Sequence, residues 1–221
     1  MARGSVQGAR RGTFIVFEGI DGSGKSTVAA LVAQRIQGER DHDVILTREP
    51  GGTSLGEGIR ELVFSEASAE ITPIAELLLF SAARAQHIAE VIEPQLRNGA
   101  IVLCDRFTDS TLAYQWGGRG VSRQTVETAQ ELATGGVSPD LRVLLDLPVC
   151  VALSRRHSDL ESVNRFDAER VAFHQSVRDA YLKLAQERQS EWIVVDANQP
   201  VQDVAEATYR RLSERMRDAQ T

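Results

Sequence analysis

The sequence predicts one α/β domain in which helices cover both faces of a five-stranded parallel sheet, giving three layers. Short apolar runs rich in β-branched residues alternate with longer segments of helical period. Some of these runs, such as 101–104, are apolar at every position, as parallel strands buried on both faces require. With 221 residues, of which 42% are hydrophobic, the chain is long enough for one such domain and its core.

The predicted elements follow one another in a regular order. Strands are expected at 13–18, 43–48, 100–105, 141–147 and 191–196. After the first strand, an apolar stripe from Val28 to Ile36 predicts a helix that ends near Gly38. A similar stripe between residues 72 and 96 predicts one long helix with Pro94 near its end. Three prolines are expected in first helical turns, where a missing N–H is tolerated: Pro73, Pro148 and Pro200.

Charge and composition exclude several classes of protein. A net charge of −6 and a pI near 5.3 disfavour a polynucleotide binder, which needs a basic face. No run approaches the roughly 20 apolar residues of a membrane span, so we expect a cytoplasmic protein without membrane or nucleic-acid partners. Cys104 and Cys150 lie in apolar runs and are expected to be reduced thiols in the core. Residues 1–12 are expected to form a flexible tail on a single domain, 13–221.

A nine-residue segment after the first strand fits the pattern G-x-x-x-x-G-K-[ST] and opens a helix, which is the context of a P-loop. Its glycines let backbone N–H groups surround phosphate oxygens, and Lys25 neutralises the β- and γ-phosphates. Ser26 is expected to bind Mg²⁺ through its hydroxyl. The sequence therefore predicts a P-loop NTP hydrolase fold whose ATP site consists of Gly19, Ile20, Asp21, Gly22, Ser23, Gly24, Lys25, Ser26 and Thr27.

Asp21 is an unusual residue inside a loop that holds a triphosphate. A carboxylate that faced the phosphates would raise the energy of the bound anion, so we expect Asp21 to point outward. It would then bind a hydroxyl group of a second substrate. The alternative is an ordinary solvated acid.

Charged residues also follow the second and third predicted strands, at the edge of the sheet where α/β folds bind ligands. Asp105 is similar to a Walker B aspartate and is expected to hold Mg²⁺ through water, while Arg106 suits an acceptor phosphate. A structural Asp–Arg pair is the alternative. Arg48 can reach the same crevice, although the Pro-Gly-Gly turn after it also explains this segment. Phe80 and Arg84 share a helix face and form either a wall for a flat base or ordinary core packing.

Taken together and in this order, the motifs resemble the bacterial thymidylate kinase family of P-loop nucleoside monophosphate kinases, from residue 13 to the C-terminus. The motifs are 17–27, 47–53, Phe80 with Arg84, 105–107, 110–115 with 118–120, 139–141 and 145–147. The resemblance implies an ATP:dTMP phosphotransferase that makes dTDP with Mg²⁺, a step of dTTP biosynthesis. It also implies a homodimer.

The resemblance implies roles for the residues of the acceptor pocket. Phe80 would stack on thymine, and Arg84 would donate to its 4-carbonyl group. Thr111 and Gln115 would read the remaining pyrimidine edge, and Tyr114 would crowd the sugar 2′ position. A donor at the 4-position opposes the amino group of cytosine, so deoxycytidylate should be rejected. Deoxyuridylate lacks only one methyl group, which is worth about 1–3 kcal/mol, so some of it should react.

The charged segment at about 154–168 is expected to be a closing lid. With Gly22 in place of a basic residue, the P-loop resembles that of a subgroup whose catalytic arginine comes from the lid. Arg156 and Arg165 are the candidates. The acceptor phosphate is already an anionic nucleophile, so positioning and charge neutralisation by Lys25, Arg106 and a lid arginine suffice without a base.

Other functions remain open at this point. A deoxynucleoside kinase would need a carboxylate base, for which Glu18 or Glu49 is available, and another pyrimidine monophosphate kinase would use the same architecture. A GTP-dependent switch is disfavoured because the chain has no N-K-x-D run. A purely structural ATP-binding protein would leave Phe80, Arg84 and Arg106 unexplained.

Overall fold

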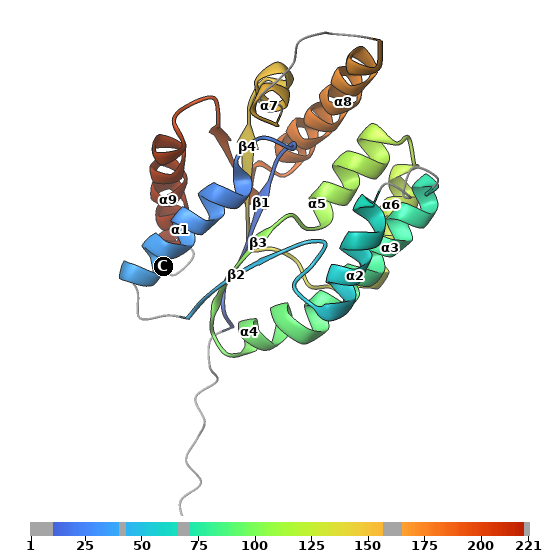
Figure 1. Cartoon of the computed structure of the whole chain (residues 1–221). Helices are drawn as coiled ribbons and strands as arrows, with labels where there is room; N and C mark the ends of the chain where they lie inside the picture. The colour runs from blue at the N-terminus through green and yellow to red at the C-terminus, as the bar shows by residue number, and fades with distance from the viewer. Residues whose placement is uncertain (1–10, 40–42, 66–70, 157–164, 219–221) are drawn as a thin grey trace, which may run out of the picture.

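The computed structural model describes residues 11–39, 43–65, 71–156 and 165–218 (Figure 1). Over these residues, five strands form one sheet in the order β2-β3-β1-β4-β5, and every neighbouring pair is parallel. The strands are β1 (Phe14–Glu18), β2 (Val44–Arg48), β3 (Ile101–Asp105), β4 (Leu141–Asp146) and β5 (Trp192–Asp196). The predicted sheet is confirmed, and each strand boundary agrees with the prediction to within one residue.

Helices cover both faces of the sheet, which confirms the three predicted layers. α1 and α9 lie on one face, and α2 to α6 lie with α8 on the other (Figure 1). The helices are α1 (Lys25–Glu39), α2 (Ser54–Phe64), α3 (Pro73–His87), η2 (Ile88–Ile92), α4 (Glu93–Arg97), α5 (Thr108–Thr111), η3 (Leu112–Gly118), α6 (Arg123–Thr134), α7 (Val149–Arg156), α8 (Arg165–Glu187), η4 (Gln189–Glu191) and α9 (Val201–Asp218).

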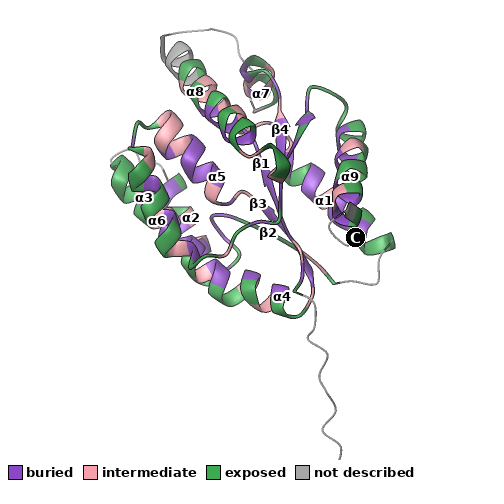
Figure 2. Ribbon diagram, turned by 180° about the vertical axis from the view of Figure 1, so that it is seen from behind, coloured by how far each residue is buried: buried purple, intermediate pink, exposed green. Residues whose placement is uncertain are grey.

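The central strand β1 shows why its sequence is apolar at successive positions. Ile15 and Phe17 belong to the core cluster that includes α1, whereas Phe14 and Val16 pack in a second cluster with η2 and α4. All four side chains are fully buried, and the strands at the centre of Figure 2 are correspondingly purple. A strand that is covered on both faces has no polar side, so the alternation seen in half-exposed strands is absent here.

The long helix expected between residues 72 and 96 is interrupted. Its middle is the π-helical η2, where the amide of Glu93 bonds to the carbonyl of Ile88, five residues earlier. Pro94 follows directly and has no N–H to donate to the ladder. The segment therefore consists of α3, η2 and α4 in succession.

Two other expectations change in detail. Cys104 is buried as predicted, but the prediction for Cys150 is wrong, because α7 turns this position to the surface. At the predicted tail, residues 1–10 lie outside the described residues. Arg11 pairs with Asp140 at 3.0 Å, and the Gly12 amide bonds to the Leu96 carbonyl at 2.7 Å, so both contact the domain.

In the described part of the chain, no helix has the length and apolar character needed to cross a membrane.

Candidate active site

The P-loop connects β1 to α1 and has a backbone shape that depends on glycine. Gly22 and Gly24 adopt φ angles of +85° and +84°, which other residues rarely adopt. A Cβ atom on Gly22 would also lie 2.2 Å from the Ala152 carbonyl oxygen of α7. A basic side chain could not occupy this position unless α7 moved, which is a physical reason for glycine here.

Lys25 begins α1 and is almost completely buried. Its Nζ donates to the Ile20 carbonyl at 3.5 Å and lies 3.7 Å from Oδ1 of Asp21. Burial, and then the charge of Arg106, lower the pKa of Lys25 to about 8. A neighbouring anion stabilises the charged form of a buried lysine, and a phosphate ligand would supply such an anion.

Arg106 follows β3 directly and has a φ angle of +74°, the one positive φ of a non-glycine residue among those described. Its Nη2 donates to Oδ1 of Asp21 at 2.6 Å, and its guanidinium lies 4.9 Å from the centre of the Tyr114 ring. Lys25 and Arg106 therefore converge on the same oxygen atom. The phosphate lysine and the predicted acceptor arginine share one site at the carboxyl edge of the sheet.

The direction of Asp21 differs from the prediction. Its carboxylate does not point away from the basic groups but lies between Lys25 and Arg106. The buried Lys25 and the partly buried Arg106 attract the acid, and this attraction outweighs the solvation that an outward position would provide. Asp21 is still 40% exposed, so it is within reach of a ligand.

Ser26 and Asp105 lie together, as a shared metal site requires. The Ser26 hydroxyl donates to Oδ2 of Asp105, while Oδ1 of Asp105 is buried and has no hydrogen-bond partner in the described structure. Hydroxyl and carboxylate oxygens are ligands that Mg²⁺ prefers, and a free carboxylate oxygen can bind its water shell. Over the described residues there is no cluster of three or more His, Cys, Asp or Glu side chains suited to a metal. The Ser26 hydroxyl and the Asp105 carboxylate fit a magnesium ion and its water shell.

Arg84 is buried on α3 and does not extend to the surface as a snorkelling arginine would. Its Nε donates to Oε2 of Glu49 at 2.7 Å, and its Nη1 to Oε1 of Gln130 at 2.7 Å. Its Nη2 donates to the Phe107 carbonyl at 3.0 Å. One helical turn earlier, the half-buried Phe80 packs beside the cluster formed by α2 and α3.

The remaining acceptor residues lie on α5 and on the π-helical η3. Thr111 and Gln115 are buried, and Nε2 of Gln115 donates to Oε1 of Glu76 at 2.6 Å. Oε1 of Gln115 is a buried acceptor without a hydrogen-bond partner in the described structure. Tyr114 places its hydroxyl 3.2 Å from Nη2 of Arg106. This segment therefore contacts Arg106 and also presents an acceptor without a partner in the described structure.

Arg48 is not drawn into the same network. Its Nη2 donates to both carboxylate oxygens of Glu57 at 2.8 Å, and the side chain is 49% exposed. It lies at the end of β2, in register with Asp105. The candidate lid arginines Arg156 and Arg165 end α7 and begin α8, but their side chains and residues 157–164 lie outside the described residues.

The structure adds residues that the motifs did not reveal. Ser110 and Tyr181 contact Arg106, whereas Gln130 and Glu49 contact Arg84. Glu49 and Ser110 lie inside recognised motifs, although no role followed from them there, and no motif or spacing rule marks Tyr181 or Gln130. Which side chains contact Arg106 and Arg84 depends on how distant segments pack together.

Comparison with known proteins identifies the family. The family model described as thymidylate kinase matches residues 17–208. A thymidylate kinase of Trichlorobacter lovleyi is 49% identical over 209 residues, covering 90% of this chain and 98% of the relative. A thymidylate kinase of Thermomicrobium roseum is 47% identical over 204 residues, covering 92% of this chain and 96% of the relative.

The chain belongs to the thymidylate kinase family. The range matched by the thymidylate kinase model contains the whole P-loop, Arg84, Arg106 and both candidate lid arginines. A further thymidylate kinase, from Geotalea uraniireducens, is 44% identical over 212 residues, covering 92% of this chain and 99% of the relative. The family's architecture thus extends over nearly the full chain.

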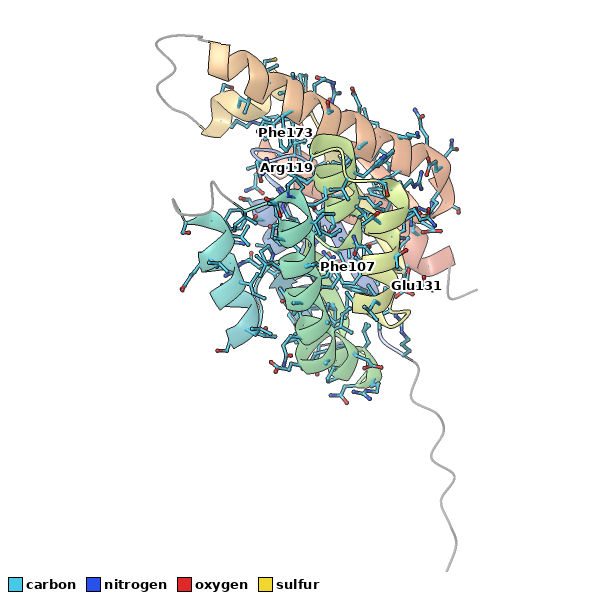
Figure 3. All side chains as sticks on the ribbon, turned by 90° about the vertical axis from the view of Figure 1, so that its right-hand side faces the viewer. Phe107, Arg119, Glu131 and Phe173 are labelled. Atoms are coloured by element: carbon cyan, nitrogen blue, oxygen red, sulfur yellow. The ribbon has the colours of Figure 1, made fainter. Side chains whose placement is uncertain are left out.

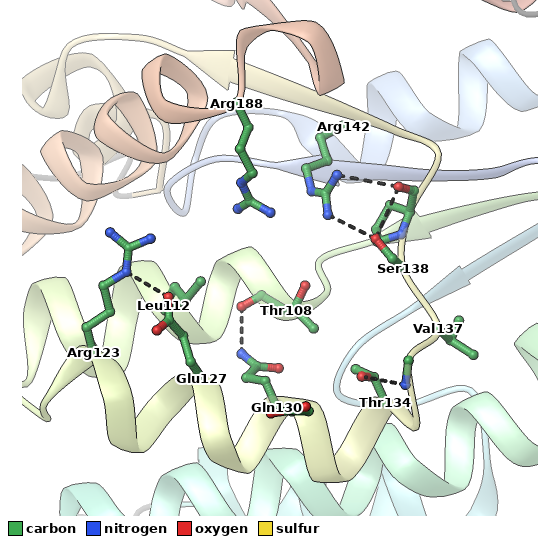
Figure 4. A pocket seen from close by; sticks show the side chains of 13 residues that line it. Thr108, Leu112, Arg123, Glu127, Gln130, Thr134, Val137, Ser138, Arg142 and Arg188 are labelled. Atoms are coloured by element: carbon green, nitrogen blue, oxygen red, sulfur yellow. Dashed lines mark hydrogen bonds and ion pairs between the residues drawn. The ribbon is translucent and has the colours of Figure 1, made fainter.

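This thymidylate kinase family member also has a cavity of about 420 Å³ beside α6, away from the P-loop (Figure 4). The cavity lies near the loop that enters β4, at the amino ends of the strands. Its wall includes Gln130, whose Nε2 donates to the Thr108 carbonyl at 2.7 Å and whose Oε1 holds Arg84. Its arginines are paired with acids, as Arg142 is with Asp109 at 2.8 Å. The cavity's arginines therefore offer no unpaired positive charge to an anionic ligand.

Proposed function

We propose that this family member transfers the γ-phosphoryl group of ATP to dTMP, giving ADP and dTDP for dTTP synthesis. The observation that carries the proposal is the convergence of Lys25 and Arg106 on Oδ1 of Asp21, at 3.7 and 2.6 Å. Lys25 belongs to the loop that would hold ATP, and Arg106 would hold the phosphate of the acceptor. Two phosphorylated ligands bound by these residues would therefore meet in one place.

The chemistry needs little beyond position and charge. An oxygen of the acceptor phosphate is the nucleophile and carries a negative charge already, so no side chain has to remove a proton from it. Lys25, Arg106 and a lid arginine, Arg156 or Arg165, would neutralise the charge on the transferred group. Ser26 and Asp105 would hold Mg²⁺, which when bound neutralises the phosphate oxygens of ATP.

The base pocket favours thymine over cytosine. Three of the five N–H groups of Arg84 bond to protein oxygens, which leaves two for the 4-carbonyl of thymine. The unpaired Oε1 of Gln115 can accept the hydrogen on ring atom N3 of thymine. Cytosine has an amino group at the 4-position and no hydrogen on N3, so both contacts would be lost. Phe80, Thr111 and Tyr114 would enclose the remainder of the nucleoside.

A deoxynucleoside kinase is the alternative, and the carboxylates argue against it. Such an enzyme must remove a proton from a 5′-hydroxyl, so a carboxylate oxygen must reach the substrate. The Glu49 carboxylate is buried against Arg84 and His87, at 2.7 and 3.0 Å. Both oxygens of Glu18 accept hydrogen bonds from residues of α5 and α8. Neither acid is available as the base.

A coupled assay of ADP formation tests the proposed function. With ATP and Mg²⁺ present, dTMP should react fastest, dUMP more slowly, and dCMP and thymidine at background rates. A higher rate with thymidine than with dTMP would replace this function by a nucleoside kinase. Equal rates with dTMP and dCMP would remove the assigned roles of Arg84 and Gln115.

A homodimer in the cytoplasm completes the proposal. α2 and α3 pack together, and five large apolar side chains on them are 47–63% exposed: Leu55, Leu62, Phe64, Ile74 and Leu78. Exposed apolar side chains concentrated on two adjacent helices are typical of a protein–protein interface, and a second copy would cover them. Cys104 and Cys150 are both free thiols, which is usual in the reducing cytoplasm.

A further inference from the structure

A buried carboxylate lies directly behind Arg106. Glu18, the last residue of β1, is fully buried, and its Oε1 accepts from the amides of Phe107 at 2.9 Å and Ser110 at 3.2 Å. Its Oε2 lies 2.5 Å from the Ser110 hydroxyl and 2.9 Å from the Tyr181 hydroxyl. These bonds join β1, α5 and α8 at a single side chain.

Tyr181 comes from α8, far from the other members in sequence. The ring is buried, and its hydroxyl lies 2.7 Å from Oγ of Ser110. Both hydroxyls also accept from Nη1 of Arg106, Ser110 at 3.0 Å and Tyr181 at 3.2 Å. One nitrogen of the guanidinium is therefore held by two oxygens that Glu18 holds in turn.

The hydrogens of this cluster can be counted. Oε2 of Glu18 and the two hydroxyl oxygens form a triangle with no side longer than 2.9 Å. Each hydroxyl has one hydrogen, and both are used inside the triangle when the carboxylate is ionised. Lone pairs on Ser110 and Tyr181 then remain for the N–H groups of Arg106. The cluster consequently faces Arg106 as a pair of acceptors.

Arg106 needs such support. Its φ angle of +74° is unfavourable for a residue with a Cβ atom, and conformations of this kind persist only where the surroundings determine them. With Nη1 held by Ser110 and Tyr181, the Nη2 side of the planar guanidinium is directed at Asp21 and Tyr114. This is the side on which Lys25 also lies.

We propose that Tyr181 is a positioning residue for phosphoryl transfer, acting with Ser110 and Glu18 to hold Arg106 toward the acceptor phosphate. The inference rests on the proposed function, because it assigns Arg106 to that phosphate. Tyr181 does not touch the reacting atoms. Tyr181 belongs to α8, whose first residue is the lid candidate Arg165. The same helix would therefore carry a candidate catalytic arginine and a residue that positions Arg106.

The variant Tyr181→Phe tests the inference because it keeps the ring and removes only the hydroxyl. Loss of one hydrogen bond to a charged group should raise the KM and Kd for dTMP about tenfold. The KM for ATP should stay within about twofold of the wild-type value. The Kd for thymidine, measured by calorimetry, should not change, because thymidine has no phosphate for Arg106 to bind.

Tyr209→Phe is the matched control, since the Tyr209 hydroxyl bonds to the carboxylate of Glu39 on α1, outside the site. It should leave every constant unchanged. Ser110→Ala should reproduce the selective loss of dTMP affinity. If Tyr181→Phe raises the Kd for dTMP and the Kd for thymidine equally, or changes neither Kd, the positioning role is wrong. If the wild-type protein prefers another monophosphate, the proposed function fails, and the same comparison is made with that acceptor and its nucleoside.

Discussion

At Arg106, four side-chain oxygens hold the guanidinium that we propose binds the acceptor phosphate. Asp21 and Tyr114 contact Nη2, while Ser110 and Tyr181 contact Nη1. Among these partners only Asp21 has a negative charge, and it is also the most exposed. An acceptor phosphate bound as proposed would therefore compete with Asp21, while the uncharged hydroxyls would keep the guanidinium in position.

Gly22 should tolerate substitution less than Gly24, although both have nearly the same φ angle. A left-handed conformation costs each alanine variant about 1–2 kcal/mol. In Gly22→Ala the new Cβ would also meet the Ala152 carbonyl at 2.2 Å, whereas nothing lies within 4 Å at Gly24. Urea unfolding should therefore show a further loss of about 1–3 kcal/mol for Gly22→Ala. Equal losses would mean that α7 yields to the added atom.

Glu18 should make stability depend on pH. Burial, followed by the charge of Asp109, raises its pKa from 4.5 to about 7. Because the folded-state pKa is the higher one, the stabilising contribution is complete below pH 4.5 and is lost as pH rises through 7. Relative to Glu18→Gln, the wild-type protein should lose up to about 3 kcal/mol of unfolding free energy between pH 4.5 and 8.

Urea unfolding of both proteins at several pH values measures this difference in the free energy of unfolding. Groups that titrate alike in both proteins cancel in the difference. Glu61→Gln, an exposed position on α2, is the control and should follow the wild-type curve. Parallel curves for Glu18→Gln and the wild-type protein would show that Glu18 does not titrate in this range.

At the level of elements, η3 and α8 pack unusually closely. A Cβ atom on Gly117 would lie 2.5 Å from Cβ of Ala180, and one on Gly118 would lie 2.5 Å from the Phe173 ring. Beside them, the Arg119 guanidinium lies 5.3 Å from the centre of the Phe173 ring (Figure 3). Two glycines thus allow the helix that carries Tyr181 to approach the segment that carries Tyr114 and Gln115.

Gly117→Ala should separate these elements. The added methyl group overpacks the contact with Ala180, so unfolding free energy should fall by about 1–3 kcal/mol and the KM for dTMP should rise. Gly58→Ala is the control, because this exposed glycine inside α2 has no atom within 4 Å of a new Cβ. It should stabilise the protein by about 0.5–1 kcal/mol with unchanged kinetics. Stabilisation by both variants would contradict close packing at Gly117.

At the level of the whole molecule, the parallel sheet gathers the site from distant segments. The loops after β1 and β3 bring the P-loop and Arg106 to one edge, and α3 lies beside them with Arg84. The exposed apolar side chains of α2 and α3 are on the layer that contributes Arg84. An interface there would therefore lie behind the residues that we propose bind the base.

Leu78→Glu tests that interface. Leu78 is 58% exposed on α3, and a charge buried between two copies would be strongly unfavourable. The mass measured by light scattering should change from that of a dimer to that of a monomer. Leu132→Glu, on α6 and 87% exposed, should remain dimeric. A monomeric wild-type protein, or a dimeric Leu78→Glu variant, would exclude this interface.

Much of the fold and part of the site could be predicted. The strands, the P-loop and the approach of Asp105 to Ser26 follow from short patterns and from the rule that parallel strands present their carboxyl ends at one edge. The orientation of Asp21 was predicted wrongly, because the position of two cations around it could not be read from its own loop. The burial of Arg84 depends on Gln130 of α6, which no motif marks.

The sequence by itself determined the succession of strands and helices along the chain, the P-loop after the first strand, and the edge of the sheet at which Asp105 and Arg106 lie. These depend on periodicity and backbone shape within short windows of the chain. Only the tertiary structure decided which side chains hold Arg106 and Arg84. Glu18 of β1 and Tyr181 of α8 are 163 positions apart and bond at 2.9 Å, because hydrogen bonds depend on how strands and helices pack in space and not on sequence spacing.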